Sequence, residues 1–136
     1  MTDTPQTQKY TILILEDDPQ LAGAVRDALV ERGFIPIVVA TVEDGIQTLK
    51  STQKVDAIWL DHYLLGTGNG VDFVTEVKNH SEWKDIPIFV VSNTASAPNI
   101  RSYLELGIEN FYTKADHDIM QIIGDIETLL KKGGNI

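Results

Sequence analysis

TILILEDDP, residues 11–19, joins a strand-like run to three consecutive acids and a proline. The first five residues, Thr11–Leu15, are β-branched or leucine, and a run of this length and composition predicts a β-strand. Asp18 followed by Pro19 predicts a helix start, because aspartate is a good N-cap and proline suits the first helical position. The stretch is therefore the first half of a βα unit, and Glu16 and Asp17 come at the carboxyl end of its strand.

The same βα unit is repeated along the chain. Each of five short apolar runs is followed by apolar residues at helical spacing, most clearly in the stripe Ile119, Ile122, Ile123, Ile126 and Leu130. The expected strands are Thr11–Leu15, Ile35–Val39, Ala57–Leu60, Ile86–Val91 and Asn110–Thr113. Strict alternation predicts an α/β protein in which a doubly wound, five-stranded parallel sheet lies between two layers of helices.

The order of the strands follows from two features. Pro36 has no backbone N–H, so its strand belongs at an edge of the sheet. The first and third strands both end in acids, at Asp17 and Asp61. Ligands of open α/β sheets bind where the chain reverses direction, outside the carboxyl ends of the strands. We therefore expect the order 2-1-3-4-5, with a crevice between Asp17 and Asp61.

Length and composition indicate one globular domain. The 136 residues are 43% hydrophobic and 23% charged, and no apolar stretch approaches the roughly 20 residues that span a bilayer. We expect a loose tail over residues 1–9, one domain over 10–132 and a short tail over 133–136. The N-terminus does not resemble a signal peptide, and the absence of cysteine excludes disulfides and thiolate metal sites. Cytoplasm is the expected location.

The chain is acidic, with 20 acidic residues, 11 basic ones and a formal net charge of −9. Binding to nucleic acid depends largely on lysine and arginine, so a nucleic-acid partner is not expected, and neither is a membrane. General acidity favours solubility, but three of the acids are adjacent, at Glu16 to Asp18. That local excess indicates a site.

Four polar groups follow four of the predicted strands and should meet at one edge of the sheet. They are the cluster Glu16 to Asp18, then Asp61, Ser92 and Lys114. Asp18 is interpreted as the helix cap, which leaves Asp17 and Glu16 as ligands of a hard cation such as Mg²⁺. Carboxylates, a hydroxyl and an ammonium together suit a divalent cation and a phosphoryl group.

Each of these residues has an ordinary explanation as well. Asp61 is either a solvated strand end or a nucleophile that forms an acyl phosphate, and the acids facing it favour the nucleophile. Ser92 either donates to a phosphoryl oxygen or forms a turn with Asn93. Lys114 taken alone would be a surface lysine. The four groups on one edge of a sheet carry the functional interpretation.

The segments ILILEDDPQL, IWLDHYLLG, PIFVVSNTA and GIENFYTKA resemble the receiver domain of two-component response regulators, the CheY-like family. The resemblance covers residues 10–130 and implies a flavodoxin-like, three-layer α/β/α fold. It also implies a role for each site residue. Asp61 would be the phosphoacceptor, and Mg²⁺ would be bound by Glu16, Asp17, Asp61 and the main-chain carbonyl of Tyr63. The phosphoryl-binding and switch residues would be Ser92, Lys114 and Phe111.

The resemblance implies a signalling domain that assists its own phosphorylation and dephosphorylation, not an enzyme with its own substrate. The donor would be a histidine kinase or phosphotransfer protein. Phosphorylation would change the face formed by the fourth helix, fifth strand and fifth helix, which would bind a protein target. The chain would be a monomer or a weak dimer through that face. Asn93, Tyr63 and Thr94 are expected to tune the lifetime of the phosphoryl group.

The sequence departs from the family pattern at several positions. Ala115 stands where receivers usually have proline after a cis peptide bond, so the loop after Lys114 is expected to differ. Leu65 replaces another usual proline, Asn93 replaces a small alanine, and the turn GTGNG is one residue longer than usual. These differences bear on kinetics and on the partner surface.

Three alternatives remain open at this point. A Mg²⁺-dependent phosphohydrolase of the haloacid-dehalogenase type would have a second acid two residues after the nucleophile, where this chain has Tyr63. An FMN-binding protein of the same strand order would cradle phosphate in the first loop, where Glu16 to Asp18 would repel it. A degenerate receiver would act only as a protein-interaction module, without phosphorylation.

Overall fold

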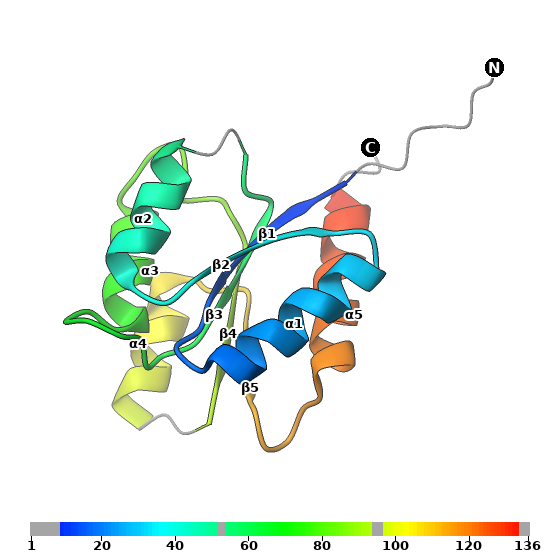
Figure 1. Cartoon of the computed structure of the whole chain (residues 1–136). Coiled ribbons are helices and arrows are strands. Elements are labelled where there is room, and N and C mark those ends of the chain that lie inside the picture. The colour runs from blue at the N-terminus through cyan, green and yellow to red at the C-terminus, as the bar shows by residue number, and fades with distance from the viewer. Residues whose placement is uncertain (1–8, 52–53, 94–96, 134–136) are drawn as a thin grey trace.

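The computed structural model describes residues 9–51, 54–93 and 97–133 (Figure 1), so Thr94 lies outside the described residues. Five strands alternate with five helices along this part of the chain, as the sequence predicts. The strands are β1 (Thr11–Leu15), β2 (Ile35–Val39), β3 (Ala57–Leu60), β4 (Ile88–Ser92) and β5 (Asn110–Thr113). The helices are α1 (Pro19–Glu31), α2 (Val42–Ser51), α3 (Gly70–Lys78), α4 (Ala97–Leu106) and α5 (Ile119–Gly133).

The five strands form one parallel sheet in the order β2-β1-β3-β4-β5, which confirms the predicted order. Helices α1 and α5 cover one face of the sheet, and α2, α3 and α4 cover the other (Figure 1). The chain reverses direction between β1 and β3. Both of these strands are buried apart from Thr11 and have a strand on either side, so their carboxyl ends are adjacent inside the sheet.

The two faces of the sheet have separate cores because side chains alternate along each strand. On β3, Ile58 and Leu60 pack with the α2–α4 layer, whereas Ala57 and Trp59 pack with α1 and α5. Each large apolar side chain that is fully buried contributes roughly 1.5–3 kcal/mol, so the paired cores supply most of the driving force for folding. They also fix which face of the sheet each residue of β3 points toward.

Local signals set the ends of the helices. Asp18 caps α1 as predicted, accepting hydrogen bonds from the backbone N–H groups of Gln20 (3.0 Å) and Leu21 (3.4 Å). Helix α1 ends before Gly33, whose φ of +87° is one that glycine adopts without strain. Asn69 forms a capping box with Asp72, so α3 begins at Gly70.

Three predicted boundaries differ from the structure, and one of them is the end of the fourth strand, which includes Ser92 and does not stop at Val91. The fourth strand begins at Ile88, not Ile86, because the backbone N–H of Ile86 donates to the Trp83 carbonyl in a turn at 3.0 Å. Proline at position 87 then has no N–H to offer a neighbouring strand. At the other end of the chain, α5 includes Gly133. No helix in the described part of the chain is long and apolar enough to cross a membrane.

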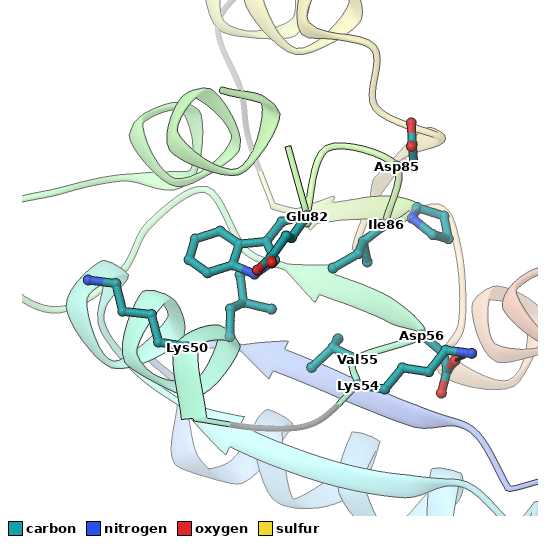
Figure 2. Close-up of a pocket in the computed structure, with 10 residues that line it drawn as sticks. Lys50, Lys54, Val55, Asp56, Glu82, Asp85 and Ile86 are labelled. Carbon is teal, nitrogen blue, oxygen red and sulfur yellow. Dashed lines mark ion pairs between the residues drawn. The ribbon is translucent and has the colours of Figure 1, made fainter. Parts of the chain in front are cut away.

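The edge of the sheet at the amino ends of the strands carries a cavity of about 540 Å³ (Figure 2). Val55, Ile86 and Trp83 contribute apolar surface to it, and charged side chains of both signs surround that surface. Asp56 lies at this edge, directly before β3. Its Oδ2 accepts a hydrogen bond from the Thr11 N–H at 2.8 Å, and its Oδ1 lies 3.5 Å from Lys54 Nζ.

Candidate functional site

The carboxyl ends of β1 and β3 bring three of the predicted acids together. Glu16, Asp17 and Asp61 each offer a carboxylate oxygen, and these three oxygens lie within 4.8 Å of one another. Glu16 and Asp61 are buried, with exposed fractions of 2% and 3%, and Asp17 is half-buried. The predicted acidic cluster is therefore real, and most of it is withdrawn from water.

The sheet itself holds these residues in place. Glu16, Asp61 and Lys114 each follow a strand by one position, yet their backbone N–H groups still donate to a neighbouring strand. The N–H groups of Glu16, Asp61 and Lys114 reach the carbonyls of Val39 (3.1 Å), Leu15 (2.9 Å) and Ser92 (2.9 Å). The site is thus built on the rigid end of the sheet and not on its loops.

Lys114 extends its ammonium between two of the acids. Its Nζ lies 3.1 Å from Glu16 Oε1 and 3.4 Å from Asp61 Oδ2, and the side chain is 16% exposed. Charges that share so little water interact more strongly than they would at the surface. One ammonium cannot, however, neutralise three carboxylates.

The remaining imbalance changes the acidity of the buried carboxyls. Burial, and then the charge of Asp61, raise the pKa of Glu16 to about 8, while Lys114 opposes the shift. Burial also raises the pKa of Asp61, with Lys114 lowering it and Asp17 adding to the rise. The cluster therefore carries too much negative charge for its burial, and a cation would relieve it.

The donor set fits a hard divalent cation. It consists only of carboxylate oxygens, the ligand type that Mg²⁺ prefers, and part of it faces the surface through the half-buried Asp17. Apart from its ion pair with Lys114, the buried Glu16 Oε1 has no hydrogen-bond partner among residues 9–51, 54–93 and 97–133. Asp18 takes no part, because its carboxylate caps α1.

The other predicted residues lie around this cluster. Ser92 is completely buried as the last residue of β4, and Asn93 after it is exposed. Phe111 is partly buried on β5, with its ring centroid 6.0 Å from that of Tyr103. The Tyr63 side chain, two residues after Asp61, is 52% exposed.

The loop after Lys114 differs from the family pattern in the way its sequence suggests. No cis peptide bond occurs in the described part of the chain, so the bond between Lys114 and Ala115 is trans. The Leu65 side chain, where proline is usual, is 55% exposed. Leu65 lines a surface pocket together with Glu16 and Asp17, and Ala115 directly follows Lys114, so both departures border the site.

Sequence reasoning missed the partners of His62. This residue follows Asp61 and is 3% exposed, with its Nδ1 2.6 Å from Tyr103 Oη and its Nε2 3.2 Å from Asn99 Nδ2. The only signal in the sequence was a polar ring directly after a wholly apolar strand. The spacing of Asn99 and Tyr103 gave no reason to connect them with residue 62.

Comparison with known proteins decides the family. The family model for the response regulator receiver domain matches residues 12–124, which is most of the chain. The chain belongs to the response regulator receiver family. It is 32% identical over 114 residues to the two-component response regulator ORR3 of rice, covering 76% of this chain and 86% of that protein.

Other relatives of this receiver domain differ in length. It is 22% identical to the chemotaxis protein CheY1 of Helicobacter pylori, over 76% of this chain and 83% of that protein. It is 28% identical to the phosphate regulon regulatory protein PhoB of Escherichia coli, over 76% of this chain but 44% of that protein. The chain thus spans less than half the length of PhoB.

Solved receiver structures share the fold at low identity. A CheY-like receiver domain protein from Methanospirillum hungatei has a TM-score of 0.83 and 17% identity, covering 94% of this chain and 98% of the other. The phosphorylated cyanobacterial phytochrome response regulator RcpA has a TM-score of 0.77 and 19% identity, covering 91% and 93%. The CheY-like, flavodoxin-like α/β/α fold expected from the sequence is confirmed.

Proposed function

We propose that this receiver domain accepts a phosphoryl group on Asp61 from the phosphohistidine of a histidine kinase or phosphotransfer protein. One observation carries the proposal: the buried Asp61 carboxylate lies within 4.8 Å of two further carboxylates and 3.4 Å from an ammonium. A carboxylate that needed only solvation would not be placed among like charges. This arrangement suits a nucleophile that meets a highly charged phosphoryl group.

The chemistry is an in-line displacement at phosphorus. An Asp61 carboxylate oxygen attacks, the phosphorus–nitrogen bond to the donor histidine breaks, and an acyl phosphate forms while the imidazole leaves. Lys114 Nζ is already beside Asp61 Oδ2, so it can hydrogen-bond a phosphoryl oxygen without moving far. Preorganised donors of this kind act where charge develops in the transition state.

Glu16, Asp17, Asp61 and the main-chain carbonyl of Tyr63 are the proposed ligands of Mg²⁺. Mg²⁺ held there would offset negative charge on the phosphoryl oxygens. The three carboxylates gathered at the ends of β1 and β3 support this assignment. Without Mg²⁺, the raised pKa of Glu16 favours a proton in place of the metal.

The proposed output is a change in a protein-binding surface. A phosphoryl group adds roughly −1.5 to −2 charges beside Ser92, whose hydroxyl could then donate to it. Phe111 would rotate inward behind Ser92. The face formed by α4, β5 and α5 would then shift from one conformation toward another. That face is the proposed binding surface for a target protein, or for weak self-association.

Residues at the mouth of the site are proposed to set the lifetime of the phosphoryl group. The exposed side chains of Tyr63 and Asn93 follow the ends of β3 and β4, where water must approach the acyl phosphate. Thr94 is proposed to act with them. Unchanged dephosphorylation after substitution of all three would contradict this role.

Intact mass after incubation with acetyl phosphate tests the proposal. We expect one phosphoryl increment that requires Mg²⁺ and is absent in Asp61→Asn. If no increment forms, candidate phosphorylated kinases are tried next, because some receivers use small donors poorly. Failure with these donors too would favour an interaction module without phosphorylation, and turnover of an aryl phosphate far beyond one equivalent would favour a phosphohydrolase.

A further inference from the structure

Helix α4 holds the residue that follows the proposed phosphoacceptor. Both ring nitrogens of His62 have a partner on this helix, Nδ1 with Tyr103 Oη at 2.6 Å and Nε2 with Asn99 Nδ2 at 3.2 Å. Asn99 and Tyr103 are four residues apart, so they lie on one face of α4. The imidazole is therefore held at two points by a single helix.

The direction of the ring follows from the alternation along β3. Ile58 and Leu60 point into the core between the sheet and the α2–α4 layer, and His62 continues that series. Tyr103 belongs to the same core and is completely buried, so its hydroxyl needs a partner inside the protein. His62 supplies that partner.

The hydrogen-bond roles are consistent with a neutral ring. The Asn99 amide nitrogen donates to Nε2, which leaves the proton on Nδ1 to be donated to Tyr103 Oη. Burial lowers the pKa of His62, in keeping with an uncharged imidazole. The contact thus adds no charge to a site that already contains three carboxylates.

Gly70 makes room for this contact and adds a third point of attachment. A Cβ at Gly70 would collide with Tyr103 Oη and would lie 3.1 Å from the carbonyl oxygen of Asp61. The Gly70 N–H donates to the His62 carbonyl at 2.9 Å. Both the ring and the backbone of His62 are therefore fixed, and Asp61 and Tyr63 are its direct neighbours in the chain.

We infer that Tyr103 is a positioning residue for the segment 61–63, and that its bond to His62 couples this segment directly to helix α4. The coupling rests on the proposed phosphorylation of Asp61, whereas the positioning does not. A shift of the segment on phosphorylation would move His62 and, through its hydrogen bonds, helix α4. This effect would add to any change transmitted through Ser92 and Phe111. Coupling of this kind is reciprocal, so loosening α4 should also disturb the segment.

Amide hydrogen exchange of residues 97–106 tests the inference, with Tyr103→Phe as the variant and Tyr112→Phe as its matched control. Tyr112 is also a buried tyrosine, but its hydroxyl donates to Asp125 Oδ2 at 2.6 Å and its ring packs on the α1–α5 side. Without metal or phosphoryl mimic, we expect exchange in α4 to accelerate about threefold to tenfold in Tyr103→Phe, as for the loss of one hydrogen bond. The control should leave α4 unchanged.

A second measurement adds Mg²⁺ and fluoroberyllate, which mimics the phosphoryl group. In the unmodified chain we expect exchange in α4 to change, and in Tyr103→Phe this response should be at least halved. Equal responses in the two proteins would overturn the coupling. Unchanged exchange in ligand-free Tyr103→Phe would overturn the positioning role, whatever the outcome with fluoroberyllate.

The two proposals can fail separately. If fluoroberyllate does not bind the unmodified chain, the phosphoacceptor function fails and the coupling fails with it, while the ligand-free comparison still decides the positioning role. Should Tyr103→Phe not fold, His62→Leu breaks the same bond from the other side and takes its place in the exchange measurements. Where both variants fold, a double-mutant cycle adds a test, in which the two substitutions together should cost less stability than the sum of each alone. Additive costs would contradict a direct bond.

Discussion

Asp56 and Asp61 flank the same four-residue strand, β3, yet their environments are opposite. The Asp56 carboxylate receives a backbone N–H from Thr11 at 2.8 Å and has the exposed Lys54 at 3.5 Å. The Asp61 carboxylate is buried among other acids, with Lys114 at 3.4 Å and shared with Glu16. A residue type therefore says little about function until its end of the strand is known.

The physical difference is how completely each charge is compensated. Asp56 has a neutral donor and the exposed ammonium of Lys54, and no other acid of the site lies beside it, so it needs no further compensation. At Asp61 burial, and to a lesser extent the charge of Asp17, raise the pKa, and Lys114 does not neutralise the whole cluster, so further compensation must come from outside the chain. Incomplete compensation is the property that suits Asp61 to its proposed role as phosphoacceptor.

The largest expected effect comes from matched substitutions at the two aspartates. Asp61→Asn should abolish the phosphoryl increment completely, whereas Asp56→Asn should be phosphorylated at nearly the normal rate. The free energy of unfolding should respond in the opposite way. Asp56→Asn should lower it by about 1 kcal/mol, because a hydrogen bond to a charged group is weakened. In metal-free protein Asp61→Asn should not lower it, because a buried charge is removed. Intact mass and urea denaturation measure the two quantities. Phosphorylation of Asp61→Asn at the wild-type level would show that Asp61 is not the phosphoacceptor.

The two lysines beside these aspartates allow the next test. Lys114→Ala removes the ammonium beside the reacting oxygen and should slow phosphorylation by acetyl phosphate about 100-fold, as for loss of one preorganised donor. Lys54→Ala removes an exposed ammonium at the other end of β3 and should change the rate very little. Equal rates in the two variants would show that Lys114 takes no part in the transfer.

A smaller effect is expected from pH. The pKa of Glu16 is about 8 in the folded protein, well above that of an unfolded glutamate, so the folded state binds more protons between these values. The free energy of unfolding of the metal-free protein should therefore fall as pH rises from about 4.5 to 8. Glu16→Gln should flatten this slope and Asp56→Asn should not. Urea denaturation at several pH values measures this slope. A slope as steep in Glu16→Gln as in the unmodified chain would show that another group causes it.

The smallest effects are expected at the mouth of the site. Alanine at Tyr63 or Asn93 should alter the rate of dephosphorylation several-fold, if these exposed side chains control the approach of water to Asp61 as proposed. Stability should hardly change, since both side chains are exposed. The decay of the phosphorylated mass with time gives the rate. Replacement of the exposed Glu82 at the other edge of the sheet provides the control that should have no effect.

The fold and the acidic cluster were predictable because both depend on local signals. Alternating apolar runs gave all five strands, Pro36 gave the edge, and the acids after β1 and β3 gave the location of the site. The start of β4 was placed two residues early, because an apolar run alone does not show that Ile86 is already bonded in a turn. The roles of the individual site residues remain predictions.

The His62–Tyr103 contact could not have been predicted in this way. It depends on how α4 lies over the sheet and on a missing Cβ at Gly70, two facts that involve segments over 30 residues apart. Sequence periodicity places Tyr103 on the buried side of a helix but does not say which polar group it meets. Contacts of this kind are decided by tertiary packing.

Pro36 has a consequence for how the molecule behaves in a crowded solution. The N–H of Ile35 points inward to Tyr10, so the next residue, Pro36, faces the open side of β2, where an N–H would otherwise be available. Exposed Ile35 and Val38 add apolar surface to this border. A strand from another chain that paired with β2 would lack one backbone hydrogen bond at Pro36. This loss disfavours the edge-to-edge pairing that leads to fibres. The proline thus disfavours association of two copies of the domain through their β2 edges.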